Sequence, residues 1–324
     1  MEKKNVLIDI CDISNPTCGF GQIARNYAER YADLQDDALQ FHFLFPKKYP
    51  EEQIPGKLST YRRGDKAMPS FHIWHSTTQH QLRHKRGQCD KFILQRGINK
   101  AAAVTCISKF VGKQVEEHFN LKGKPVHVIY NGVEDIASDP QSKPAFATGR
   151  PFFFAIGQIR KKKNFHLLVD MMAQFPDHDL YICGDDHFDF SATVRKHISQ
   201  LPAKNAFLCG KISAEEKVWL YAHCEAFLFA SQGEGFGLPA IEAMQFGKPV
   251  FISNCTCLPE ICGDCAYVWD TLEPKAMARV VREKLPLFHA DASLAAKAKA
   301  HAAAFSYERH LRAYIQLYKE ILKD

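Results

Sequence analysis

The feature that most constrains the fold is a regular alternation in the second half of the chain. Short apolar runs of strand length alternate with segments of helical periodicity, such as residues 214–223. This alternation indicates a parallel sheet with helices on both faces. The predicted strands are residues 151–156, 180–183, 206–208, 226–230 and 250–253.

Glycines or polar residues closely follow the ends of these predicted strands. Gly157, Gly184, Gly210 and the turn at 231–237 come after four of them. Ligands of parallel sheets bind at the carboxyl ends of the strands. We therefore expect these residues to face one cleft.

The first half of the chain alternates less regularly. A helix is predicted at 109–119, with Ser108 as its cap. Residues 133–150 carry turn-forming residues and little periodicity, which predicts a linker. The predicted strands of this half are residues 5–10, 40–45, 71–74, 91–94, 101–107 and 125–130.

Bulk properties exclude several classes of protein. The chain has 324 residues, 46% hydrophobic and 24% charged, which is typical of a globular protein with room for two domains. A net charge of +6 is too small to indicate nucleic-acid binding. Residues 5–10 are interpreted as a first strand and not as a signal peptide, and no run approaches the ~20 apolar residues of a membrane span. Eleven cysteines without a secretion signal predict a reducing cytoplasm.

The stretch at 231–249, S-Q-G-E-G-F-G-L-P-A-I-E-A-M-Q-F-G-K-P, carries the most chemistry. A glycine-rich turn leads into a helix with Pro239 in its first turn. Backbone N–H groups and the helix dipole at such a junction favour an anion. Glu234 lies in the turn, and Glu242 lies on a helix otherwise built from apolar residues, where a carboxylate is costly without partners. Sugar or ribose hydroxyls are suitable partners.

The pattern E-x7-E, as E-G-F-G-L-P-A-I-E-A-M-Q-F-G-K-P-V, resembles the donor-site signature of glycosyltransferase family 4. The resemblance implies an α/β chain of the GT-B fold, with two Rossmann-like parallel-sheet domains facing a central cleft. The expected parts are an acceptor-side domain at 1–132, a linker at 133–150, a nucleotide-sugar domain at 151–305, and a helix at 306–324 that returns to the first domain.

The resemblance also implies roles for residues of the second domain. Glu242 would bind the ribose diol, and Glu234 the sugar hydroxyls, together with the turn that contains Gly235, Phe236, Gly237 and Leu238. Backbone around Gly210 and Ile212 would read the base. In G-Q-I-R-K-K-K-N, Lys163 matches the lysine that binds the donor diphosphate. Gln158 departs from the usual arginine, so Arg160 or Lys162 is a candidate for the second positive charge.

Candidate residues of the first domain are fewer. Gly19 and Gly21 fit G-x-G-x-x-A, but no acidic residue ends the second strand, which argues against a dehydrogenase. The resemblance implies a glycine loop that approaches the diphosphate and acceptor. His75 is interpreted either as a catalytic residue that orients an acceptor hydroxyl or as a structural histidine.

Two further patterns concern a loop and a metal site. Relatives usually carry a His-Asp pair after the strand that we place at 91–94. Either this loop is deleted here or its residues are missing from the chain; we favour the second, which predicts an interruption between Leu94 and Gln95. Cys262 and Cys265 have the C-x-x-C spacing of a zinc site, but the same segment fits the family's loop. No metal ligand is predicted.

The predicted function is retaining transfer of a hexosyl group from a UDP-, GDP- or ADP-linked sugar to a hydroxyl of a glycan or lipid-linked acceptor. No metal and no cofactor besides the donor are expected, and no nucleic-acid partner. The expected location is cytoplasmic, with peripheral contact at the inner face of a membrane left open. A nucleotide-sugar epimerase of GT-B shape and a non-catalytic binding module are the alternatives.

Overall fold

The chain forms two compact units, each built from separate stretches of sequence. The computed structural model describes residues 3–10, 13, 19–32, 36–54, 58–62, 65, 70–76 and 87–323. The smaller unit contains Met1–Val104, Phe119–Pro125 and Ala313–Asp324, and the larger contains Thr105–His118 and Val126–Arg312. The backbone therefore passes between the units four times.

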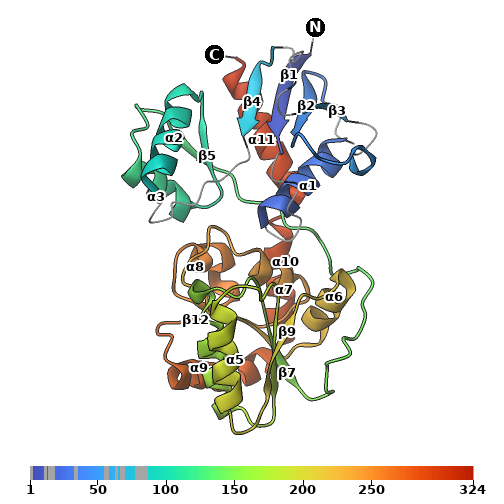
Figure 1. Ribbon diagram of the computed structural model, residues 1–324, viewed down its shortest axis with the longest axis vertical. Helices are drawn as coiled ribbons and strands as arrows, with labels where there is room; N and C mark the ends of the chain where they lie inside the picture. Colours follow the sequence, from blue (N-terminus) through green and yellow to red (C-terminus); the bar gives the residue numbers. More distant parts are fainter. Residues whose placement is uncertain are drawn as a thin grey trace. The chain divides into compact units, whose positions relative to one another are not determined.

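A six-stranded sheet forms the centre of the larger unit, and all of its neighbouring strands are parallel (Figure 1). Its order is β12-β11-β10-β7-β8-β9, so the direction in which strands are added reverses between β7 and β10. Such a reversal leaves a crevice at the carboxyl ends of the two strands, where ligands bind. The strands are β7 (Phe152–Ile156), β8 (Asp179–Cys183), β9 (Ala206–Gly210), β10 (Ala226–Phe229), β11 (Val250–Ser253) and β12 (Tyr267–Trp269).

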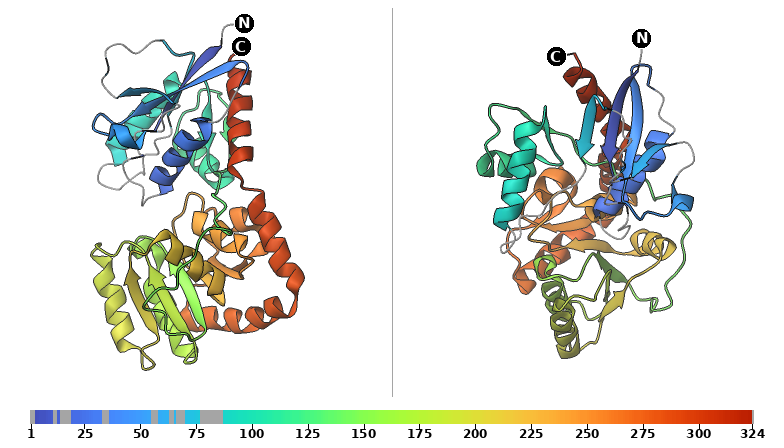
Figure 2. Two further views of the ribbon diagram at one scale, coloured as in Figure 1. Left: turned by 90° about the vertical axis from the view of Figure 1, so that its right-hand side faces the viewer. Right: turned by 45° about the horizontal axis from the view of Figure 1, so that its top comes forward.

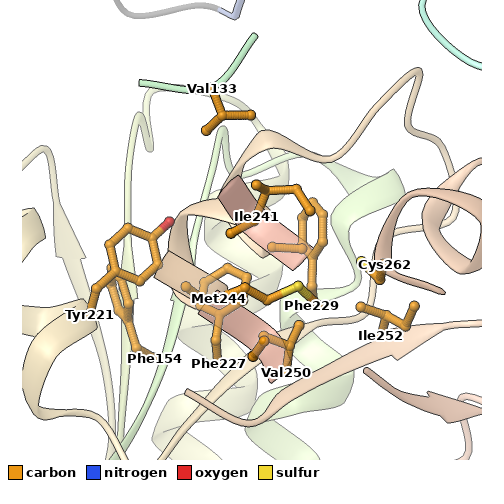
Figure 3. Close-up of a cluster of buried hydrophobic side chains, with 14 of the residues drawn as sticks. Val133, Phe154, Tyr221, Phe227, Phe229, Ile241, Met244, Val250, Ile252 and Cys262 are labelled. Atoms are coloured by element: carbon orange, nitrogen blue, oxygen red, sulfur yellow. The ribbon is translucent and has the colours of Figure 1, made fainter. Parts of the chain in front are cut away.

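Helices cover both faces of this sheet because successive strand residues point to opposite sides. Phe152 and Phe154 of β7 belong to one buried cluster, whereas Phe153 and Ala155 belong to the other. Figure 3 shows the first cluster, in which side chains from the strands meet Ile241 and Met244 of α7 and Tyr221 of α6. The helices are α4 (Phe165–Met171), α5 (Phe190–Gln200), α6 (Ala214–His223), α7 (Leu238–Gln245), α8 (Leu258–Cys262), α9 (Pro274–Ala290) and α10 (Ala292–Ala303), with 3-10 turns η3 (Lys161–Lys163), η4 (Met172–Gln174) and η5 (Gly263–Cys265).

The larger unit also contains α3 (Lys109–His118), next to the small sheet of β5 (Val104–Cys106) and β6 (Val126–Val128). Ser108 caps α3 as predicted, since its Oγ accepts the N–H of Val111 at 3.2 Å. The Glu260 carboxylate accepts from the next two amides, Lys109 N at 2.7 Å and Phe110 N at 2.9 Å. Both contacts satisfy amides that the helix itself leaves without partners.

The smaller unit contains a parallel sheet of order β3-β2-β1-β4. In Figure 2, α11 lies alongside this sheet. Tyr314 of α11 stacks on His75 of β4, with ring centroids 4.6 Å apart. The elements are β1 (Lys4–Asp9), α1 (Gly19–Ala32), β2 (Leu39–Phe45), η2 (Glu51–Gln53), β3 (Ser59–Arg62), β4 (Ile73–Ser76), α2 (Gly87–Lys100) and α11 (Tyr307–Ile321), of which residues from Ala313 onward belong to this unit.

One prediction for the first half is wrong. Residues 91–94 are not a strand but part of α2, which continues through Leu94 and Gln95, so the predicted interruption between them is absent. A four-residue apolar run fits a strand or a helix equally well, and the surrounding helical segment decides the outcome. No helix in the described ranges is long and apolar enough to cross a membrane.

Candidate functional site

The backbone just after β8 lies so close to the end of β7 that no side chain fits at Gly184. Gly184 has φ +127°, and a Cβ on it would lie 2.1 Å from the carbonyl oxygen of Gly157. Its N–H donates to the carbonyl of Gly210 at 2.7 Å. The glycines predicted to follow neighbouring strands therefore meet at one edge of the sheet.

The reversal point of the sheet holds an ion pair between two predicted site residues. Lys163 comes from η3 after β7, and Glu234 from the turn after β10; Lys163 Nζ lies 2.5 Å from Glu234 Oε1. Their side chains are only 13% and 15% exposed. Ser231 Oγ donates to the same oxygen at 2.6 Å, and Lys163 Nζ lies 5.0 Å from the centroid of the Phe229 ring. A cation and a carboxylate are thus held together where a ligand of this fold would bind.

Groups behind the glycine-rich turn hold its backbone in place. Glu234 N donates to Thr256 Oγ1 at 3.3 Å, and Cys257 Sγ donates to the carbonyls of Glu234 and Phe236 at 3.4 and 3.2 Å. Ser108 Oγ donates to the carbonyl of Gly235 at 2.9 Å. Sequence reasoning missed these supports, because they come from segments far from the turn.

The turn ends at the start of α7. Gly237 has φ +109°, and a Cβ on it would lie 2.7 Å from Leu258 Cδ2, so glycine is required there. Pro239 stands in the first turn, as predicted. No described residue accepts a hydrogen bond from the N–H groups of Phe236 or Leu238. These donors and the positive end of the helix together suit an anion.

Glu242 of α7 has two protein partners. Tyr221 OH donates to its Oε2 at 2.8 Å, and Lys217 Nζ lies 3.2 Å from its Oε1. The Glu242 side chain is 13% exposed. Burial, followed by the charge of Glu242, raises the pKa of Tyr221 well above its ordinary value, so the hydroxyl stays protonated and donates. A carboxylate has about four acceptor positions, so further donors can still bind. Lys217 and Tyr221, four residues apart on α6, are a signal that sequence reasoning overlooked.

The remaining predicted site residues of the larger unit make contacts of their own, outside the Lys163–Glu234 pair and the partners of Glu242. Gly210 ends β9 with φ +71°, and Ile212 packs partly buried against the first cluster. The guanidinium of Arg160 lies 4.1 Å from the centroid of the Phe188 ring. The stem of Lys162 lies beside Gly233, where a Cβ would be 3.3 Å from its Cδ.

The predicted residues of the smaller unit lie on α1 and β4. Gly19 and Gly21 lie in the first turn of α1 and not in a loop before it. His75 Nδ1 is hydrogen-bonded to Tyr318 OH at 2.6 Å and stacks on Tyr314. These are the contacts of a structural histidine; its role toward an acceptor stays a prediction.

The cysteine cluster packs inside the larger unit. Cys257 and Cys262 are buried, and burial raises the pKa of the Cys257 thiol to about 12. Asp185 of the same unit is paired with His187, and its Oδ2 lies 3.5 Å from Lys211 Nζ. Within the described ranges, no three His, Cys, Asp or Glu side chains are grouped to hold a metal ion.

Family models match both parts of the chain. The model described as glycosyl transferases group 1 matches residues 138–300, and that of glycosyltransferase family 4 matches residues 55–135. The serotype-specific mannosyltransferase WbdA of Escherichia coli is 30% identical over 214 residues, covering 59% of this chain and 26% of the relative. The O-antigen chain mannosyltransferase RfbU of Salmonella typhimurium is 26% identical over 202 residues, covering 60% and 55%.

The chain thus matches about a quarter to a half of the length of these curated relatives. Among solved structures, Anabaena Alr3699/HepE in complex with UDP and glucose aligns with a TM-score of 0.75 and 16% identity over 98% of this chain and 99% of that one. At this identity the likeness supports the fold alone, which is GT-B. Since the group 1 model spans half of the sequence, the chain belongs to the family of glycosyl transferases group 1.

Proposed function

We propose that this protein is a retaining glycosyltransferase that moves a hexosyl group from a nucleoside diphosphate sugar to a hydroxyl of a glycan or lipid-linked acceptor. The observation that carries the proposal is the Lys163–Glu234 pair, held at the reversal point of the sheet beside the start of α7. A diphosphate needs fixed positive charge and N–H donors, whereas a sugar needs acceptors. Lys163 supplies the charge from the segment after β7, and the turn after β10 supplies both N–H donors and the Glu234 carboxylate.

The donor would be oriented by the two carboxylates. Glu242 would accept hydrogen bonds from the ribose hydroxyls while keeping Tyr221 and Lys217 as its protein partners. Glu234 would accept from the hydroxyls of the transferred sugar. The relatives WbdA and RfbU are named as mannosyltransferases, which makes mannose the first sugar to test.

The fixed charge of the site supports the proposal that transfer needs no metal ion. The departing nucleoside diphosphate gains negative charge, which fixed cations and backbone dipoles can stabilise. Lys163 and the N–H groups at the start of α7 would supply this stabilisation, with the second cation coming from Arg160 or Lys162. Chelation with EDTA should then leave the rate of transfer unchanged.

Retention is taken over from family 4. The acceptor oxygen would attack the anomeric carbon on the face from which the diphosphate leaves, forming one C–O bond as the other breaks. The acceptor's proton would pass to the departing phosphate oxygen. No carboxylate nucleophile is needed in this route, so Glu234 and Glu242 would act as hydrogen-bond acceptors only.

The location of the protein is part of the proposal. A lipid-linked acceptor would bring it to the inner face of the cytoplasmic membrane as a peripheral protein. Sedimentation with lipid vesicles, with and without 0.5 M salt, would measure this association.

The test combines binding with turnover. UDP, GDP, ADP and their hexose conjugates are screened by thermal shift on the wild type and on Glu242→Gln, and then incubated with glycan acceptors. A ligand at ~100 times its Kd stabilises by about 2.7 kcal/mol, which is several degrees of Tm. We expect one nucleotide to shift the wild type strongly and the variant weakly, and its hexose to be transferred.

The alternatives give different results. A change of sugar configuration without acceptor would favour the epimerase. Binding without either product would favour a binding module, and no shift with any nucleotide would contradict the donor site itself.

A further inference from the structure

Thr256 has a backbone conformation that its side chain disfavours. Its φ is +55°, in the left-handed region, where a β-branched residue is a genuine outlier. The other described non-glycine residues with positive φ are Lys122, Asn164 and Lys204. Asparagine tolerates this region, and neither lysine is β-branched. Thr256 is therefore the one described position where a branched side chain is kept against its own preference.

A residue kept in a disfavoured conformation indicates that its side chain makes contacts the structure needs. The Thr256 hydroxyl accepts the N–H of Glu234 at 3.3 Å and donates to the carbonyl of Cys255 at 2.8 Å. Both hydrogen-bonding capacities of this hydroxyl are thus used, and one of them is directed at the turn that carries the site carboxylate.

The next residue holds the opposite side of the same peptide segment. Cys257 Sγ donates to the carbonyls of Glu234 and Phe236 at 3.4 and 3.2 Å. Together the two side chains fix both the N–H and the C=O of Glu234. The Glu234 carboxylate is fixed separately, by Ser231 at 2.6 Å and Lys163 at 2.5 Å.

We propose that Thr256 is a positioning residue that sets the Glu234 backbone so that its carboxylate meets the hydroxyls of the donor sugar. The proposal rests on the function proposed above. Thr256 acts through Glu234 and touches no substrate itself. With the backbone at 256 in the left-handed region, Oγ1 lies 3.3 Å from the N atom of Glu234, 22 residues away in the chain.

The inference predicts separate effects on stability and on sugar recognition. Thr256→Gly relieves the backbone conformation but removes the hydroxyl, so its Tm should exceed that of Thr256→Ala, which loses the same hydroxyl without that relief, while both variants hold the donor sugar less well. Thr256→Ala removes the hydroxyl and keeps the Cβ, and Thr256→Ser keeps the hydroxyl without branching. Lys204→Gly is the matched control, since Lys204 has φ +50° and is exposed in a different loop.

The experiment measures by calorimetry the Kd of each nucleotide sugar and of its free nucleoside diphosphate: UDP-glucose and UDP, and GDP-mannose and GDP. KM and kcat are measured for the nucleotide sugars. In Thr256→Gly and Thr256→Ala, we expect the Kd and KM of the nucleotide sugar to rise about tenfold, the loss of one good hydrogen bond. The Kd of the free nucleoside diphosphate should change less than twofold. Thr256→Ser should match the wild type, and Lys204→Gly should raise Tm without changing either Kd.

Other results would overturn the inference. Equal weakening of nucleotide sugar and nucleoside diphosphate would mean that the whole turn had been disturbed, and unchanged values in Thr256→Ala would mean that the hydroxyl is dispensable. A Tm of Thr256→Gly no higher than that of Thr256→Ala would contradict the interpretation of the Thr256 backbone as strained. If the wild type bound none of the nucleotides of the thermal-shift screen, ADP and its hexose conjugate included, the proposed function would fail first, and the role of Thr256 with it.

Discussion

The buried histidine of α11 should make the larger unit sensitive to acid. His310 is 4% exposed, and its Nδ1 donates to the carbonyl of Tyr130 at 2.6 Å. Burial lowers its pKa to about 4, with the carbonyl contact acting in the opposite direction. The folded protein therefore keeps this imidazole neutral at a pH where an unfolded chain, with a histidine pKa of about 6.5, would protonate it.

The sign of the effect follows from which state binds the proton. The folded pKa is lower than the unfolded one, so the stabilisation is complete above pH ~6.5 and is lost as the pH falls toward 4. The full difference between the two pKa values corresponds to roughly 3 kcal/mol of unfolding free energy, of which about 2 kcal/mol is already lost at pH 5.

The measurement is urea unfolding at pH 7.5 and pH 5.0 for the wild type, His310→Gln and His310→Leu. Neither variant can titrate at 310, so the loss of unfolding free energy between the two pH values should be about 2 kcal/mol smaller in both than in the wild type. Other groups contribute equally to all three proteins and cancel in the comparison. If the variants lose as much stability as the wild type, the burial of His310 does not control its protonation, and the reasoning is refuted.

Three other changes test the site and its support. Glu242→Gln should weaken nucleotide binding by about 10- to 100-fold, because a charged acceptor becomes neutral; calorimetry with the free nucleotide measures it, and an unchanged Kd would exclude Glu242 from the site. Gly184→Ala should lower the free energy of unfolding by roughly 3 kcal/mol or more, because the new Cβ meets the Gly157 carbonyl at 2.1 Å and φ is +127°. Gly97→Ala is the matched change in α2, where nothing lies within 4 Å, and should raise stability by about 0.5–1 kcal/mol in the same urea assay.

The second half of the sequence could be predicted well because its strands are buried on both faces. Strands of that kind are continuous apolar runs, and the predicted strand at 250–253 coincides with β11. The helix predicted at 214–223 coincides with α6 for a related reason, since Ser213 and Glu216 form a capping box at its start. Here local sequence and tertiary packing favour the same structure.

Two parts of the first half were predicted wrongly or missed, and both carry a weak apolar pattern. The strand β3 has no fully buried residue and was not predicted, and residues 91–94 belong to a helix. In such segments the apolar pattern is too brief to separate a period of 2 from a period of 3.6.

The site residues were predicted singly, but their contacts were not. Lys163 and Glu234 are 71 positions apart, and nothing in either segment indicates that they pair. The left-handed backbone of Thr256 could not be predicted, because threonine is a residue that disfavours it. Contacts of this kind depend on the packing of several strand ends and appear only when the chain is folded.

The larger unit is built from separate stretches of sequence, and this affects how related genes can recombine. Residues 105–118 belong to that unit although they precede most of it in the sequence, and Ser108 among them holds the carbonyl of Gly235. A single recombination event between two related genes, placed anywhere from 119 to 230, would combine this segment from one parent with the donor turn from the other. Chimaeras that exchange 105–118 together with 126–312 should keep a matched pair, and natural variation in the two stretches should be linked for the same reason.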